Sequence, residues 1–153
     1  MITRDIVIEE ARTWIGTPWQ HQAMVKGHGV DCAMFIAGVG LEVGLVTEDD
    51  LNNIPAYPKD WHLHNTESML IPILEQFEVS EIPLEEALPG DIVMFKVANC
   101  ESHLGILTKQ DWFIHAFTSS KVNRVVECRL DGRWTKRLSR VYRFNHFMEN
   151  VDE

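Results

Sequence analysis

A change in hydrophobic periodicity near residue 89 is the feature that most limits how this chain can fold. Before that point, apolar residues recur every three or four positions, as in amphipathic helices; after it, they form short runs between turn residues. Helices followed by antiparallel strands indicate an α+β fold, with helices packed on one side of a sheet. The chain has 153 residues and no internal repeat or linker-like stretch, so it is predicted to be one domain, 1–153.

Three helices are expected in the first half. Thr3 can cap the first helix. The second should begin at Cys32 and stop at Gly44. A third is expected over residues 69–77, where Pro72 should kink or split it.

A mainly antiparallel sheet of five strands is expected in the second half. The segment that follows the turn at Pro89-Gly90 has the apolar composition of a buried strand. The five expected strands are residues 91–95, 103–108, 112–117, 122–127 and 138–144.

The net charge of −9 is unevenly distributed. Residues 1–120 hold 6 basic and 18 acidic side chains, whereas residues 121–143 hold 8 basic and 2 acidic ones. A basic sheet edge, protected from pairing with other sheets, is the favoured interpretation. The alternative is a docking strip for an anionic polymer such as cell-wall glycan, or for an acidic partner. A nucleic-acid partner is not expected, because the whole domain is acidic and the strip lacks interleaved aromatic residues.

Neither a secretory signal nor a membrane span is expected. Residues 1–10 carry three acidic side chains, and no apolar signal core follows them. No apolar run approaches the roughly 20 residues that cross a bilayer. We therefore expect a protein that is synthesised in the cytoplasm and has no membrane partner.

The three cysteines differ in their surroundings. Cys32 opens an apolar helical run, where the first backbone N–H groups and the helix dipole stabilise a thiolate. We predict that Cys32 is a reactive nucleophile with a thiol pKa below the ordinary value. Cys100 and Cys128 are predicted to be unbonded to Cys32 and dispensable.

Two histidines have the spacing of a catalytic pair. A thiolate needs a base, and the base needs a third group that fixes its tautomer. If residues 109–111 form a three-residue loop between two strands, Gly105 faces His115, and His103 lies diagonally from His115 on the same face of the sheet. A two-residue turn would instead place the two histidines on opposite faces.

The chain resembles the NlpC-type cell-wall cysteine peptidases, which have a papain-like core. The resemblance covers nearly the whole chain and depends on the order and intervals of five motifs. These are WIGTPW at 14–19, DCA at 31–33, PGDIVMF at 89–95, SHLGI at 102–106 and FIHA at 113–116.

The resemblance implies both a triad and a substrate. Cys32 would be the nucleophile, His103 the base and His115 the orienting residue. The substrate would be a peptide or isopeptide bond in the stem peptide of bacterial peptidoglycan, cleaved without a cofactor or metal. The chain looks most like members associated with phage tails or gene-transfer particles, so phage-tail proteins are expected partners.

The resemblance also implies an oxyanion and substrate-binding region formed by Trp19, Asp31 and Ser102. Trp19 stands where the family has an aromatic hydroxyl, and its indole N–H is also a hydrogen-bond donor. Ala33-Met34 replaces the usual Ser-Gly after the cysteine, and the loop over residues 20–30 lacks the usual Gly-Gly pattern.

Three alternatives remain open at this stage. The first is a zinc site formed by cysteines and histidines, although no paired ligand spacing supports it. The second is a tail assembly subunit that keeps the fold without catalysis. The third is a related amidase or acyltransferase with the same Cys-then-His order. The side chains considered for the zinc site are Cys32, His62, His64, Cys100, His103 and His115.

Overall fold

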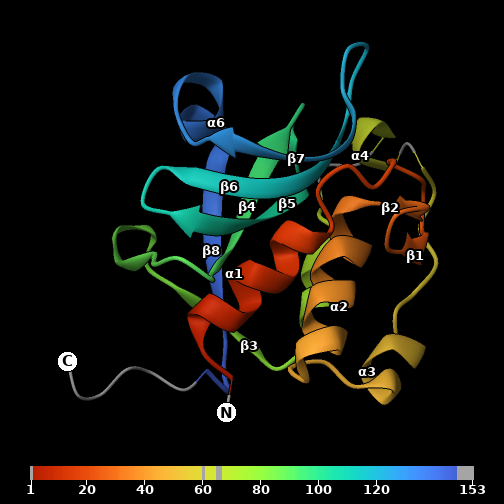
Figure 1. Ribbon diagram of the computed structural model, residues 1–153. Helices are drawn as coiled ribbons and strands as arrows, with labels where there is room; N and C mark the ends of the chain where they lie inside the picture. Colours follow the sequence, from red (N-terminus) through yellow and green to blue (C-terminus); the bar gives the residue numbers. More distant parts are fainter. Residues whose placement is uncertain (1, 60, 65–66, 148–153) are drawn as a thin grey trace.

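The computed structural model describes residues 2–59, 61–64 and 67–147, and it has the predicted α+β architecture (Figure 1). The main sheet has six strands in the order β3-β8-β4-β5-β6-β7, and each neighbouring pair is antiparallel. Its strands are β3 (Val79–Ile82), β4 (Ile92–Val97), β5 (Cys100–Lys109), β6 (Trp112–Thr118), β7 (Asn123–Arg129) and β8 (Leu138–Phe144).

The expected count of five strands is therefore wrong by one. The missing strand is β3, an edge strand that pairs only with β8 among the described residues. Its two central residues, Ser80 and Glu81, are both exposed. Such a short, half-polar segment becomes a strand only because β8 offers it an unpaired edge. A separate two-stranded sheet, β1 (Met24–Val25) with β2 (Gly29–Val30), was not expected either.

The first two expected helices form, with the expected N-cap at Thr3 and the expected stop at Gly44; the N-cap at Asp31 was not expected. Helix α1 (Arg4–Thr13) begins after Thr3, whose side-chain oxygen accepts a hydrogen bond from the Ile6 N–H at 3.3 Å. Helix α2 (Cys32–Val43) begins after Asp31, whose side chain accepts from the Met34 N–H. It ends at Gly44, which has a φ of 90° that favours glycine.

The third helix is shorter than expected. Helix α5 (Leu70–Leu74) has only five residues, so Pro72 lies in its first turn, where a missing N–H breaks no hydrogen bond. The predicted kink is therefore absent from this helix. Other short helices were not expected: α3 (Glu48–Asn52), α4 (Trp61–His64), the 3₁₀ turn η1 (Leu84–Glu86) and α6 (Gly132–Arg137).

The sheet has apolar cores on both of its faces. Helices α1 and α2 pack on one face, against residues such as Leu104, Ile106 and Ile114. Trp134 of α6 covers a smaller core on the other face, with Phe95 and Phe113. Neighbouring residues of one strand thus enter different cores, as the alternation of side chains requires. None of the described helices is long and apolar enough to span a bilayer.

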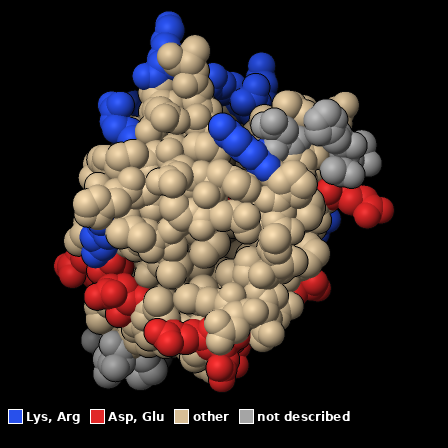
Figure 2. Space-filling view, turned by 90° about the vertical axis from the view of Figure 1, so that its right-hand side faces the viewer, with Lys and Arg blue, Asp and Glu red and all other residues tan. Residues whose placement is uncertain are grey.

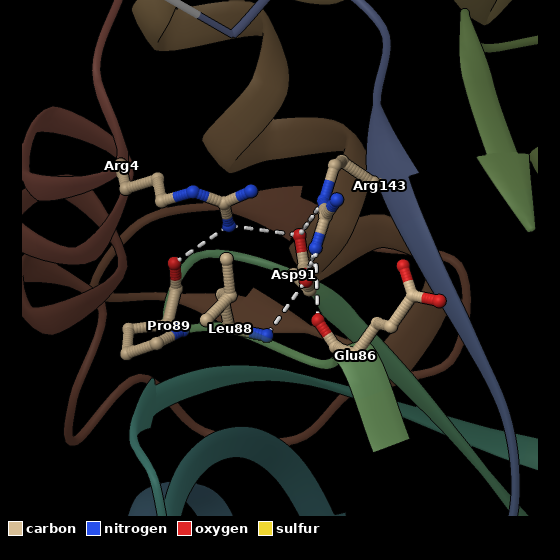
Figure 3. A network of polar contacts seen from close by, with 6 residues as sticks. All are labelled: Arg4, Glu86, Leu88, Pro89, Asp91 and Arg143. Carbon is tan, nitrogen blue, oxygen red and sulfur yellow. Dashed lines mark hydrogen bonds and ion pairs between the residues drawn. The ribbon is translucent and has the colours of Figure 1, made fainter. Parts of the chain in front are cut away.

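A buried carboxylate joins the first helix to the sheet (Figure 3). Asp91 is 0% exposed and forms ion pairs at 2.9 Å with both Arg4, from α1, and Arg143, from β8. Asp91 also accepts a hydrogen bond from the Leu88 N–H. Arg4 also donates a hydrogen bond to the Pro89 carbonyl oxygen. This network anchors the turn that precedes β4.

The basic segment over residues 121–143 does not form one continuous edge. Strand β7 is indeed at the sheet edge, but β8 lies inside the sheet. Three arginines of the 121–143 segment have acidic partners: Arg129 with Asp111, Arg140 with Glu81 and Glu101, and Arg143 with Asp91. Figure 2 shows that Lys and Arg gather at the upper end of one side of the molecule and Asp and Glu at the lower end. Much of the surface between them is uncharged.

Candidate active site

Cys32 is the first residue of helix α2, as predicted. Asp31 is the N-cap, so the thiol lies at the positive end of the helix dipole. The Cys32 Sγ atom lies 3.9 Å from the carbonyl oxygen of Ser102, which precedes His103 on β5. The cysteine is thus beside the strand that carries the predicted base.

His103 and His115 lie in direct contact. The Nε2 atom of His103 is 2.6 Å from the Nδ1 atom of His115, and the two side chains are 8% and 0% exposed. This contact uses Nε2 of His103 and leaves its Nδ1 atom outside the histidine pair. The same-face arrangement expected from the strand register is present.

The turn that produces this register differs from the expected one. Lys109 pairs with Trp112, so the turn has two residues, which alone would put the histidines on opposite faces. A bulge between Leu107 and Lys109 adds one residue and reverses that effect. Beyond the bulge, Leu107 pairs with Phe113 and Ile106 with Ile114, which is the register that a three-residue loop was expected to set.

Gly105 provides space beside His115. A Cβ atom at position 105 would lie 2.9 Å from the Ile114 carbonyl oxygen and 3.3 Å from the Cβ of His115. Any larger side chain at this position would therefore push β6 away from β5 and separate the histidines. The glycine of the SHLGI motif is required by this close approach of two strands.

Aromatic side chains enclose the histidine pair. The ring centroid of Trp134 lies 5.5 Å from that of His103 and 5.0 Å from that of His115. Phe117 stacks on His115 at 5.1 Å. Sequence analysis missed Trp134, because α6 is a short helix in a basic segment and no local pattern links it to strands β5 and β6.

A pocket of about 130 Å³ brings the predicted site residues together. Its lining includes Cys32, His103, Trp19, Asp31 and Ser102. This volume is below that of pockets that enclose a drug-sized ligand, roughly 300 Å³ or more. The pocket is therefore too small to enclose a drug-sized molecule.

Asp31 has a structural role in this pocket. One of its oxygens caps α2, and the other accepts hydrogen bonds from the Gln22 N–H at 2.7 Å and the Tyr57 hydroxyl at 2.6 Å. His21 Nδ1 lies 4.0 Å from the same oxygen. Sequence analysis did not identify Tyr57, which reaches the pocket from a segment of no clear period. The predicted substrate-binding role of Asp31 stays a prediction.

Trp19 and Ser102 both line this pocket. Trp19 lines the pocket, and the Lys59 ammonium is 5.5 Å from the centre of a Trp19 ring. The Ser102 hydroxyl is buried and has no hydrogen-bond partner among the described residues. A buried hydroxyl without a partner is unusual. The roles of both residues in catalysis remain predictions.

The thiol of Cys32 does not have the lowered pKa that was predicted. Burial raises the pKa of Cys32 to about 12, and the charge of Asp31 adds to this effect. Hydrogen bonds from the backbone of Leu104 and Ala33 act in the opposite direction. The helix start therefore does not outweigh desolvation in the unliganded pocket.

Both histidines are neutral for the same reason. Burial lowers the pKa of His103 to about 3, with a further contribution from Arg137. Burial, His103 and Arg133 lower the pKa of His115 to about 2. The unliganded site therefore contains a thiol and two neutral imidazoles rather than a thiolate–imidazolium pair.

The other two cysteines are free, as predicted, but they differ in position. Cys100 is buried, and its thiol donates to the Glu67 carbonyl oxygen at 3.5 Å. Cys128 lies 3.4 Å from the Nε2 atom of His115. Cys128 therefore lies in contact with the histidine pair, and its dispensability stays a prediction.

The structure offers no support for the zinc alternative. Across residues 2–59, 61–64 and 67–147, no three side chains of His, Cys, Asp or Glu lie together as a set of cation ligands. His62 lines the pocket beside His103. The side chain of His64 lies outside the described part of the chain.

The fold and the site together indicate the class of this protein. An α+β domain with a cysteine at a helix start and a histidine pair on adjacent strands has the papain-like NlpC-type fold. The model of the NlpC/P60 family matches residues 16–143 of the chain. The protein belongs to the NlpC/P60 family.

Similar proteins extend this assignment. The chain is 30% identical over 118 residues to the probable endopeptidase NlpC of Escherichia coli strain K12, covering 76% of this chain and 63% of that protein. A lipoprotein-like NLP/P60 family structure from Staphylococcus aureus Mu50 matches with a TM-score of 0.63 and 21% identity, over 94% of this chain and 41% of that one. The NlpC/p60 domain of the peptidoglycan hydrolase SagA matches with a TM-score of 0.64 and 18% identity, over 92% and 97%. The chain thus spans less than two thirds of the first two proteins.

Proposed function

We propose that this protein is a cysteine peptidase that hydrolyses a peptide or isopeptide bond in the stem peptide of bacterial peptidoglycan. The observation that carries the proposal is the pocket that joins Cys32, at the start of α2, to the contacting pair His103 and His115. Membership of the NlpC/P60 family supports the substrate class, as does the description of SagA as a peptidoglycan hydrolase.

In the proposed reaction, deprotonation accompanies attack. Because the resting thiol and imidazole are both neutral, His103 Nδ1 takes the proton of Cys32 as the sulfur attacks the carbonyl carbon. His115 receives a hydrogen bond from the other nitrogen of His103, which orients the ring and stabilises the positive charge that forms on it.

The negative charge of the tetrahedral intermediate falls at the start of α2. Backbone N–H groups of the first helical turn and the helix dipole stabilise an oxyanion there. We propose the Trp19 indole N–H as a further donor and the Ser102 hydroxyl as a contact for the substrate. Both residues line the pocket beside Cys32.

The second half of the proposed reaction regenerates the enzyme. His103 gives its proton to the leaving amine, the C–N bond breaks, and the acyl group remains on Cys32 as a thioester. Water then enters, His103 takes a proton from it, and the hydroxide attacks the thioester. The acid product leaves, and the proton returns to the sulfur.

Digestion of purified peptidoglycan tests the proposal, with the released fragments identified by mass spectrometry. The wild-type protein should release peptides with a new amine and a new carboxylate at one bond type. Cys32→Ala and His103→Ala should fold and release none, whereas His115→Ala should keep partial activity. Cys100→Ser is the matched control for removing a thiol outside the pocket. If Cys32→Ala cleaves peptidoglycan as well as the wild type does, Cys32 is not the nucleophile.

The same digestion, repeated with an added amine, separates hydrolysis from the two remaining alternatives, an acyltransferase and an inactive assembly subunit. An acyltransferase would pass the acyl group to an added amine rather than to water, which gives a product of different mass. An inactive assembly subunit would give no product with either acceptor.

Delivery by a phage tail or gene-transfer particle is a further part of the proposal, and it rests on the family resemblance described from the motifs. Mass spectrometry of purified particles from the source cells tests it. The protein should be present at a constant ratio to tail proteins, and its absence from such particles would refute the association.

A further inference from the structure

A row of four side chains crosses the sheet from the pocket to its edge. Cys32 shares the pocket with His103 of β5, His103 contacts His115 of β6, and His115 contacts Cys128 of β7. In the β6–β7 ladder, Cys128 pairs with Phe113 and His115 with Val126, so His115 and Cys128 are diagonal neighbours. Their side chains share the face that Trp134 covers.

The two contacts of His115 couple the protons of the row. His115 is neutral, so one of its ring nitrogens carries a proton and donates a hydrogen bond, and the other nitrogen accepts a hydrogen bond. If Nε2–H donates to the Cys128 sulfur, Nδ1 accepts from His103 Nε2–H. His103 Nδ1 then has the lone pair that a base requires. The opposite arrangement, in which Cys128 donates, leaves a proton on His103 Nδ1 and blocks it.

The surroundings of Cys128 favour the first arrangement. An imidazole N–H is a better donor than a thiol, and the separation of 3.4 Å suits an N–H···S contact. Arg133 of α6 faces this region, with its guanidinium 5.8 Å from the Phe117 ring and 5.2 Å from the Trp134 ring. Burial raises the pKa of the Cys128 thiol, the positive charge of Arg133 acts in the opposite direction, and Glu127 of the same strand adds to the rise.

We propose that Cys128 is a positioning residue: its sulfur accepts the Nε2–H of His115, and this fixes both histidines in the tautomers that leave His103 Nδ1 free to act as a base. The catalytic consequence rests on the proposed function, whereas the tautomers are a property of the unliganded protein. None of the five sequence motifs contains Cys128.

Nitrogen-15 NMR of histidine-labelled full-length protein tests the tautomers, because protonated and unprotonated ring nitrogens have different chemical shifts. At pH 7.5, His103 and His115 should both carry their protons on Nε2. In Cys128→Ala, His115 should become a mixture of tautomers. Cys128→Ser, which keeps an acceptor, should restore the wild-type spectrum in large part. Cys100→Ala is the matched control and should leave both rings unchanged.

Kinetics on peptidoglycan fragments provide the second readout. In Cys128→Ala, kcat should fall about tenfold, as expected for the loss of one hydrogen bond of about 1.4 kcal/mol, while KM stays constant. If this variant does not fold, Cys128→Val removes the acceptor and keeps the volume. A proton on His115 Nδ1 in the wild type, or unchanged tautomers without the sulfur, would overturn the inference. If the wild type cleaves no peptidoglycan, the proposed function fails and the NMR result still decides the role of Cys128.

Discussion

Mild acid should destabilise this protein through its two buried histidines. The perturbation is a change from pH 7 to pH 5, above the range in which most carboxylates titrate. Burial lowers the pKa of His103 to about 3 and that of His115 to about 2, so both rings stay neutral in the folded protein at pH 5. In the unfolded chain, with a pKa of about 6.5, both bind a proton.

The sign and size of this change in unfolding free energy follow from proton linkage. The unfolded state binds more protons below pH 6.5, so acid favours unfolding, and the effect grows until the folded pKa values are reached. At pH 5, the loss is about 2 kcal/mol for each histidine and about 4 kcal/mol for the pair. Such a loss is a large fraction of the stability of a domain of this size, about 5–15 kcal/mol.

Urea unfolding between pH 7 and pH 5, followed by circular dichroism, measures this loss. His115→Gln should lose about half as much stability over the same range as the wild type, whatever its stability at pH 7. His28→Gln is the matched control, because the His28 side chain is exposed and meets water in both states. A constant unfolding free energy between pH 7 and pH 5 in the wild type would refute the argument.

Three further predictions follow from the structure. Asp91→Asn should lower the unfolding free energy by about 3–5 kcal/mol, because it removes the buried charge that forms ion pairs with both Arg4 and Arg143; thermal unfolding should show this, with the exposed Ser80→Ala nearly unchanged. Trp19→Phe should lower kcat by about 10²–10³ with little effect on KM, as for loss of one oxyanion donor, and an unchanged kcat would exclude that role. Because burial raises the pKa of Cys32 to about 12, alkylation of Cys32 by iodoacetamide should be slow at pH 7 and rise about tenfold per pH unit up to pH 10. Fast alkylation at pH 7, measured by peptide mass spectrometry, would show that the resting thiol is ionised.

Several features of the protein could be predicted from the sequence because they depend on residues close together in the chain. Thr3 determines where α1 begins and Gly44 where α2 ends, since caps act on the backbone within a few residues. The same locality places Cys32 at the start of a helix.

Tertiary structure alone decided the electrostatics and the enclosure of the site. The first helical turn favours a thiolate at Cys32, but desolvation by distant segments exceeds that local effect and raises the pKa. Trp134, Tyr57 and Cys128 reach the site from segments whose local patterns carry no sign of it. A bulge, rather than the length of the turn, sets the register of the histidines, because cross-strand packing can compensate for a turn of the wrong length. The sequence thus determined which residues could react, and packing between distant segments determined their protonation and their neighbours.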